Sequence, residues 1–153
     1  MSEDLKANMN PTMLKFGAPA TVLQGYNHWL VQLRPAQATL GSLVLIARAA
    51  ARAFPELSRD AFTELARVTK DIEAVLTGKF GYEKLNYLML MMVDPDVHFH
   101  VIPRYAAPKQ FSGVVFTDPG WPGPPDLGHD NKVDSSVLTR LTDELKSAWQ
   151  DRI

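Results

Sequence analysis

Short, mostly apolar segments separated by turn residues in the first third of the chain predict short strands. Residues 21–23 and 28–33 (HWLVQL) flank residues 25–27, a Gly-Tyr-Asn segment that is typical of a turn between two strands. A loop-forming RPAQATLGS segment follows, and then residues 43–48 (LVLIAR) form a short apolar run that predicts a buried strand. The short connections favour antiparallel pairing, because parallel neighbours need a long crossover.

After Ser58 the apolar positions have a helical spacing. A serine at this place can cap a helix by accepting a backbone hydrogen bond, and Asp60 favours the positive end of the helix dipole. Gly78 and Gly81 are expected to end the helix. Its apolar residues keep a spacing of three and four and form one stripe, made of Phe62, Leu65, Val68, Ile72, Val75 and Leu76.

The next segment combines a continuous apolar run with an alternating one. Residues 86–93 (NYLMLMMV) are apolar at nearly every position, which predicts a central strand covered on both faces. A turn at residues 94–95 (Asp-Pro) separates it from residues 96–102 (DVHFHVI), where polar and apolar residues alternate as in a half-buried strand. Pro103 is expected to stop strand pairing.

The remaining chain completes the expected architecture. The TDPGWPGPPDLG stretch is rich in Pro and Gly and predicts a loop, and residues 135–149 have the apolar spacing of a last helix. We therefore predict an α+β fold with an antiparallel sheet of about five strands, one long helix packed on it and a C-terminal helix. Residues 1–16 are expected to form an N-terminal arm, and residues 17–153 a single domain.

Composition narrows the function classes. A length of 153 residues is usual for one domain, and 46% hydrophobic residues are ordinary for a globular fold. A net charge of -1 offers no electrostatic reason to expect a nucleic-acid or membrane partner. Without cysteine there is neither a disulfide framework nor a thiolate metal site. No run is long and apolar enough to span a bilayer, and the polar N-terminus lacks a signal-peptide core, so we expect a cytoplasmic protein.

The alternating strand carries the chemistry that the sequence suggests. Because side chains two residues apart share a face of a strand, Asp96, His98 and His100 are expected to point one way. Three interpretations remain open: two histidines on a half-exposed sheet face, a metal site made of two imidazoles and a carboxylate, or nucleophilic catalysis by one imidazole. The opposite face is apolar and would fix the histidine rings, through Val97, Phe99 and Val101.

The motif from His98 to Arg104, HFHVIPR, resembles the signature of the histidine triad (HIT) superfamily, which is His-φ-His-φ-His-φ-φ, often followed by Pro-Arg. The order of parts is similar as well: an early hairpin, a loop carrying the Leu-Gly pair at residues 40–41, a strand, a long helix, a strand and the motif strand. The resemblance covers residues 21–105 and leaves residues 106–153 as a C-terminal loop and helix.

This resemblance implies a nucleotidyl hydrolase or transferase that acts on nucleoside phosphoramidates or dinucleoside polyphosphates, such as a diadenosine polyphosphate, without a cofactor. By position, His98 is the nucleophile that forms a nucleotidyl-histidine, and His100 helps to bind phosphate and to protonate the leaving group. Asp96 occupies the place of the first triad histidine, where its carboxylate either impairs the enzyme or orients an imidazole. The resemblance also implies a homodimer with sheets joined edge to edge.

The chain departs from the family pattern in two further places. A Gly-rich loop with a Gln normally precedes the motif strand, whereas residues 93–96 are expected to form only a tight turn. Ser42 stands where many members have a histidine, and it can still donate a hydrogen bond. Arg104 and Trp121 are further candidates for substrate contacts, with Arg34 ranked below Arg104. The alternatives are a nucleotide-binding relative with little turnover, and a metal-binding protein that uses the acid and both histidines of the motif.

Overall fold

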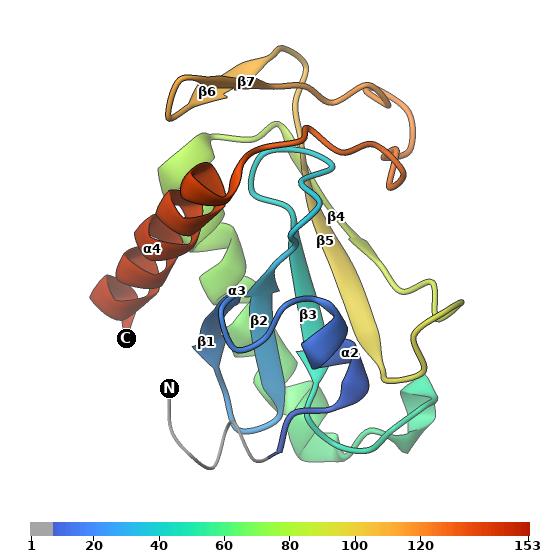
Figure 1. The fold of residues 1–153 in the computed structure, drawn as a ribbon. Helices are drawn as coiled ribbons and strands as arrows, with labels where there is room; N and C mark the ends of the chain where they lie inside the picture. Colours follow the sequence, from blue (N-terminus) through green and yellow to red (C-terminus); the bar gives the residue numbers. More distant parts are fainter. Residues whose placement is uncertain (1–7) are drawn as a thin grey trace.

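A five-stranded antiparallel sheet forms the centre of the computed structural model, which describes residues 8–153 (Figure 1). The strand order is β1-β2-β3-β5-β4, and every neighbouring pair is antiparallel. This confirms the predicted α+β class, including the hairpin of the first two strands and the buried third strand. The bounds are β1 (Val22–Gly25), β2 (Trp29–Leu33), β3 (Leu43–Ala47), β4 (Lys84–Leu88) and β5 (His98–Arg104).

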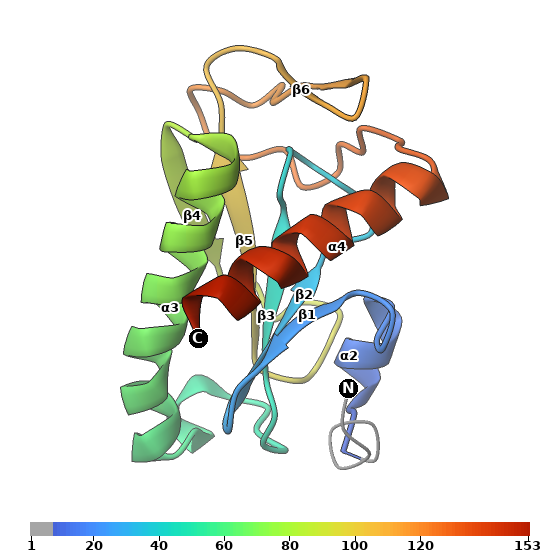
Figure 2. The same cartoon turned by 90° about the vertical axis from the view of Figure 1, so that its left-hand side faces the viewer.

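Two helices, α3 (Arg59–Phe80) and α4 (Ser135–Arg152), cover one face of this sheet (Figure 2). The Ser58 side chain accepts a first-turn N–H of α3, and Gly81 ends the helix in the left-handed region at φ 60°, as predicted. Gly78 lies inside the helix instead of ending it. The core on this side joins the inward residues of β2, β3 and β5 to the helices, among them Val31, Leu45, Val101, Ile72, Leu76, Leu141 and Trp149.

A short helix, α2 (Pro11–Lys15), packs on the opposite face of the sheet. We had expected residues 1–16 to form an arm; residues 1–7 lie outside the described part of the chain, and the residues that follow are integrated into the fold. The Gln32 side chain on β2 donates to the carbonyls of Met13 at 3.1 Å and Phe16 at 3.3 Å, which ties α2 to the sheet. The small core beneath α2 consists of Met13, Ala18, Val22, Leu30, Val44 and Ile46.

The apolar run at residues 86–93 does not form a central strand, and this prediction was wrong. Strand β4 ends at Leu88 and is an edge strand, paired only with β5. The connection to β5 therefore spans residues 89–97 and is longer than the expected tight turn. Within it Met92 is 83% and Val93 is 81% exposed. A continuous apolar sequence is typical of burial on two sides, but it does not say whether any element covers it.

Strand β5 also extends further than predicted, because it runs through Pro103 to its end at Arg104. Pro103 pairs with Leu85 of β4. On the other side, the pairing of β5 with β3 ends at Val101, so the missing N–H of the proline removes no hydrogen bond from that ladder. The Pro103 carbonyl accepts the hydroxyl of Thr39 at 2.6 Å.

The remaining elements lie around this core. A short 3-10 helix, η1 (Phe54–Glu56), precedes α3, and a small hairpin, β6 (Lys109–Phe111) and β7 (Val114–Phe116), stands beyond one end of the sheet (Figure 1). The Pro- and Gly-rich loop then returns to the sheet, where the Asn131 N–H donates to a carbonyl of the β2–β3 connection at 3.0 Å. Across the described residues, no helix combines the length and the apolar character needed to cross a membrane.

Candidate active site

His98 and His100 lie side by side on β5, on the face of the sheet that α2 covers. Their rings are edge to face, with centroids 5.3 Å apart. The exposed fractions of the two residues are 2% and 9%. On the neighbouring strand β3, Ile46 pairs with His98 and Val44 pairs with His100, so each histidine has an apolar cross-strand neighbour on the same face. The predicted placement of the two histidines on one face is what the alternation of β5 produces.

The ring of His98 is held by a backbone carbonyl. Its Nδ1 lies 2.7 Å from the carbonyl oxygen of Asp96. A carbonyl can only accept a hydrogen bond, so Nδ1 carries the proton and Nε2 keeps its lone pair. The nitrogen with nucleophilic character is therefore defined by the fold, without any side-chain acid.

The Asp96 carboxylate is bound by α2, the helix that lies on the same face of the sheet as the two imidazoles. It accepts the Thr12 hydroxyl at 2.8 Å and the Thr12 N–H at 3.4 Å, and the residue is only 5% exposed. Asp96 precedes the first residue of β5, and no hydrogen bond joins its carboxylate to either imidazole among the described residues. The orienting atom is its backbone oxygen.

A metal site made of Asp96, His98 and His100 does not form in this arrangement. Among residues 8–153, no three side chains of His, Cys, Asp or Glu lie close enough together to hold a metal ion. The Asp96 carboxylate is held by the Thr12 hydroxyl at 2.8 Å instead. The metal-binding interpretation of the motif is thereby corrected.

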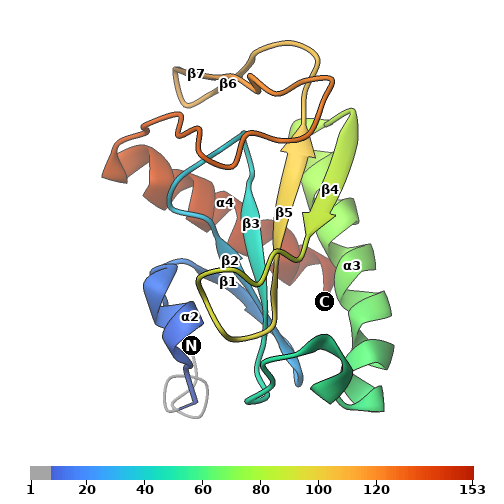
Figure 3. The same ribbon diagram turned by 90° about the vertical axis from the view of Figure 1, so that its right-hand side faces the viewer.

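Phe16, at the end of α2, covers the two imidazoles. Its ring centroid lies 6.3 Å from that of His98 and 5.9 Å from that of His100. Beside it, a cavity of about 260 Å³ opens onto both histidines. The exposed loop between β4 and β5 forms one wall of this cavity and approaches α2 (Figure 3), where Lys15 and Asp94 form an ion pair at 2.8 Å.

Burial, and after it the positive charge of Arg34, lowers the pKa of His100 to about 4. His100 is therefore a neutral imidazole near pH 7. Its Nδ1 is buried and has no hydrogen-bond partner among the described residues. A buried polar atom without a partner costs free energy, and such atoms in native proteins call for an explanation, for which a ligand is one candidate.

Arg34 lines the same cavity, although the sequence made Arg104 the stronger candidate for a substrate contact. It follows the last residue of β2, two positions after Gln32, and thus continues the face that carries the histidines. The Arg34 Nε is buried and has no partner among residues 8–153. In the sequence, Arg34 stands at the end of a strand, but so does Arg104, and this position alone does not distinguish the two arginines.

Ser42, Arg104 and Trp121 lie apart from the histidines. Arg104 is six residues from His98 along β5, which corresponds to roughly 20 Å. The Ser42 hydroxyl stays within its own turn, where it donates to the Thr39 carbonyl at 2.9 Å and accepts the Thr39 N–H at 3.0 Å. Trp121 borders a second cavity, of about 470 Å³, together with Arg104.

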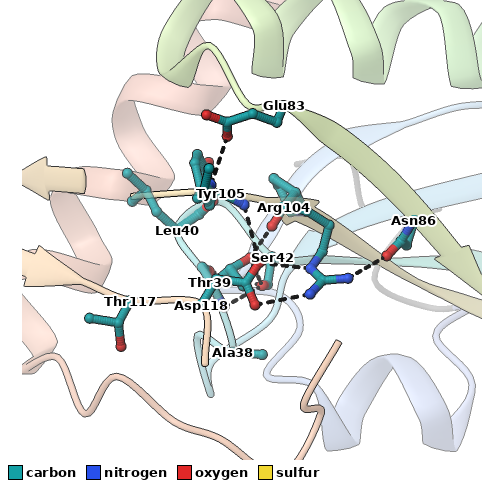
Figure 4. Close-up of polar contacts among 12 residues, drawn as sticks. Ala38, Thr39, Leu40, Ser42, Glu83, Asn86, Arg104, Tyr105, Thr117 and Asp118 are labelled. Carbon is teal, nitrogen blue, oxygen red and sulfur yellow. Dashed lines mark hydrogen bonds and ion pairs between the residues drawn. The ribbon is translucent and has the colours of Figure 1, made fainter. Parts of the chain in front are cut away.

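Each of the three nitrogens of the Arg104 guanidinium donates a hydrogen bond (Figure 4). Its Nε and Nη2 donate to the Asp118 carboxylate at 2.8 and 3.1 Å, and its Nη1 donates to the Asn86 side chain at 2.9 Å. Both side chains of the ion pair are almost completely buried, with exposed fractions of 4% and 1%. Asp118 also accepts the Tyr105 N–H at 3.1 Å. This network anchors the C-terminal loop to the end of β5.

Comparison with known proteins identifies the fold. No protein-family model and no curated protein matches the chain. A histidine triad protein of Sinorhizobium meliloti 1021 is similar, with a TM-score of 0.70 and 20% identity over 91% of this chain and 94% of that one. A hypothetical histidine triad nucleotide-binding protein of Sulfolobus tokodaii strain7 has a TM-score of 0.66 and 14% identity over 92% and 90%. A zinc-bound histidine triad family protein of Mycobacterium smegmatis has a TM-score of 0.61 and 15% identity over 92% and 91%.

Proposed function

Because the chain has the fold of histidine triad proteins, as the motif resemblance predicted, we propose that it is a nucleotidyl hydrolase or transferase. Its substrate is a nucleoside phosphoramidate or a dinucleoside polyphosphate, and the reaction proceeds through a nucleotidyl-histidine on His98. The observation that carries this proposal is the bond between Nδ1 of His98 and the Asp96 carbonyl. It leaves Nε2 as the ring nitrogen with the lone pair. His98 lines the cavity, and the carboxylate among the described lining residues, Asp94, is already paired with Lys15.

The proposed reaction has two displacements at phosphorus. The Nε2 lone pair of His98 forms a bond to the α-phosphorus, and the bond from phosphorus to the leaving group breaks, with its electron pair going to the leaving group. Water or another acceptor then attacks the same phosphorus and releases its proton to the solvent, the P–N bond breaks, and the electron pair returns to Nε2. Nδ1 keeps its proton throughout. Covalent catalysis of this kind replaces one difficult displacement by two easier ones.

The other predicted site residues receive different proposals. His100, neutral and next to the nucleophile, is placed to bind a phosphate oxygen. Ser42 and Arg104 are engaged within the protein, so we propose that they support the frame of the site. Trp121 borders the second cavity and is our candidate for stacking on a distant base of a dinucleotide substrate.

The covalent intermediate is directly testable. Incubation with a diadenosine polyphosphate or an adenosine phosphoramidate, followed by rapid acid quenching and intact-mass spectrometry, should show an adenylyl increment. His98→Ala should abolish the adduct and turnover with the fold retained. His129→Ala is the matched control, because His129 lies in the C-terminal loop outside the cavity, and it should behave like the wild type. Full turnover in the His98→Ala variant would remove this residue from the nucleophile role.

A second candidate function is nucleotide binding with little turnover. The specific observation that favours it is the engagement of Asp96 by Thr12, which leaves the first position of the triad without a side chain in the cavity. Adenosine monophosphate that binds in calorimetry, with no adduct and no turnover of either substrate class, would decide for this alternative.

We also propose that the protein forms a homodimer through β4. This edge strand has one unpaired side, and Leu90 and Met92 in the following loop are 49% and 83% exposed. Unpaired strand edges next to exposed apolar residues are typical of association sites. Sedimentation equilibrium at several concentrations should give twice the chain mass, and a monomer mass at high concentration would refute the dimer.

A further inference from the structure

Arg34 differs from the other charged groups around the cavity because no acidic side chain forms an ion pair with it among the described residues. Its Nη1 donates to the Ala36 carbonyl at 3.0 Å and its Nη2 to the Leu127 carbonyl at 3.1 Å. These carbonyls orient the guanidinium but do not neutralise it. The acidic group whose charge reaches Arg34 is Asp130, which is exposed and makes no ion pair with it. The buried Nε is left without a partner.

Arg34, His98 and His100 thus line one cavity, and two of them carry a buried nitrogen without a partner among the described residues, Nε of Arg34 and Nδ1 of His100. The acid at the mouth, Asp94, is already paired with Lys15. The Arg34 guanidinium is a good match for phosphate oxygens, since charge-assisted hydrogen bonds are about twice as strong as neutral ones. The cavity therefore has the charge and the donors for an oxyanion.

Building on the proposed function, we propose that Arg34 binds the anionic leaving group, so that the protein acts on phosphoanhydrides such as dinucleoside polyphosphates in preference to nucleoside phosphoramidates. When Nε2 of His98 bonds to the α-phosphorus of an anhydride, the bridging P–O bond breaks and the departing phosphate keeps the electron pair. The leaving group gains one negative charge, and a fixed guanidinium stabilises that charge as it develops.

A phosphoramidate makes a different demand on the site. Its P–N bond breaks, and the amine needs a proton in order to leave. His100 is the group beside the nucleophile, and its lowered pKa, about 4, leaves it without an extra proton near pH 7. A phosphate leaving group needs no such proton, because its second pKa is near 6. The chemistry of both residues thus favours the anhydride.

The decisive experiment compares two substrates that transfer the same adenylyl group. We expect the wild type to show a higher kcat/KM for diadenosine tetraphosphate than for adenosine 5′-phosphoramidate. Arg34→Gln should lower kcat/KM for the tetraphosphate by about 100-fold, the scale of a lost charge-stabilising donor. Its effect on the phosphoramidate should be far smaller. Arg48→Gln, an arginine outside the cavity, is the matched control and should leave the ratio unchanged. A wild-type preference for the phosphoramidate, or an equal loss on both substrates, would overturn the proposal.

A binding measurement separates this proposal from the one on catalysis. Inorganic pyrophosphate, titrated by calorimetry, should bind the wild type and the His98→Asn variant alike, bind Arg34→Gln at least about 10-fold more weakly, and bind Arg34→Lys with intermediate affinity. Binding that depends on Arg34 in a protein that forms no adduct would refute the hydrolase and support the anion site. Equal binding by the wild type and Arg34→Gln would refute the anion site even if the adduct forms.

Discussion

Arg34 and Arg104 lie on the same face of one sheet, and each stands at the end of a strand, yet their surroundings are opposite. Arg104 gives two hydrogen bonds to the buried carboxylate of Asp118 and one to Asn86. Arg34 gives its hydrogen bonds to two backbone carbonyls and has a buried Nε with no partner. The charge of Arg104 is neutralised by a buried carboxylate, whereas no carboxylate forms an ion pair with Arg34 among the described residues.

The difference teaches that an arginine's role follows from its partners more than from its position in a motif. Arg104 belongs to the HFHVIPR motif and was the stronger candidate for a phosphate contact, but a buried ion pair leaves it little capacity for a ligand. Arg34 lies outside the motif and keeps its charge available beside His98 and His100. Unsatisfied groups reduce stability and therefore tend to persist where function requires them.

The largest effect that we predict separates the two arginines by stability. Arg104→Met leaves the buried Asp118 carboxylate without its cation, so the free energy of unfolding should fall by about 3–5 kcal/mol. Arg34→Met removes a charge that no carboxylate neutralises, so it should cost less, about 1–3 kcal/mol for its two hydrogen bonds at about 0.5–1.5 kcal/mol each. Urea unfolding followed by circular dichroism measures both values under the same conditions.

A double variant provides the control for this comparison. In Arg104→Met/Asp118→Leu neither partner remains as a buried charge, and part of the lost stability should return, although the Tyr105 N–H then loses its acceptor. If Arg34→Met proved as destabilising as Arg104→Met, the two arginines would not differ in how much their partners stabilise the fold, and the contrast would be refuted.

The second prediction concerns pH. The pKa of His100 is about 4 in the folded protein because of burial and then the Arg34 charge, against 6.5 when unfolded. The unfolded state therefore binds more protons between these pH values, so His100 reduces the free energy of unfolding as pH falls from about 6.5 to 4. The loss is up to about 3 kcal/mol and vanishes above pH 7. Urea unfolding of wild type and His100→Gln over this range isolates the effect.

The same titration connects with the two arginines. Removal of the positive charge in Arg34→Met should raise the pKa of His100, since that charge opposes protonation of the ring. Arg104→Met should leave it unchanged, because Arg104 is not among the groups that shift it. Proton NMR of the imidazole resonances, recorded from pH 3 to 8, would show either result. A pKa near 6.5 in the wild type would contradict the buried, neutral His100.

The third prediction tests how Asp96 supports the nucleophile. Thr12→Val removes the hydroxyl that binds the Asp96 carboxylate at 2.8 Å and leaves a buried acceptor poorly satisfied, at a cost of about 1–3 kcal/mol. Asp96→Asn keeps an acceptor oxygen and the backbone carbonyl, so turnover should change little. Nitrogen-15 shifts of His98 report whether Nδ1 stays protonated. A large loss of turnover in Asp96→Asn would show that the carboxylate itself acts on the chemistry.

Much of the fold could be predicted from the sequence because its signals are local. Strands β1, β2 and β3 follow from short apolar segments and turns, and α3 follows from the stripe after Ser58 and its ending at Gly81. The error at residues 86–93 has a physical cause. Hydrophobicity reports a preference for burial, whereas coverage depends on which elements lie nearby, and here part of the run stays exposed in a loop.

The site was predictable only in part because several of its contacts join distant segments. The two histidines share a face because they are two residues apart on a strand, and this spacing can be read directly from the sequence. Thr12, by contrast, meets Asp96 across 84 positions, and Arg34 meets the Leu127 carbonyl across 93. No local pattern encodes these pairs, so the orientation of the acid and the availability of the arginine required the structure.

The smallest predicted effect concerns a third cation, Lys15, whose ion pair with Asp94 joins α2 to the loop before β5. The lysine side chain is 50% exposed, against 4% for Arg104, so solvent screens this pair. Lys15→Met should therefore change the free energy of unfolding by only about 0.2–1 kcal/mol, and 0.5 M salt should remove most of that difference. A loss of several kcal/mol in the free energy of unfolding that does not depend on salt would mean that the Lys15–Asp94 pair is shielded from solvent as well as the Arg104–Asp118 pair is.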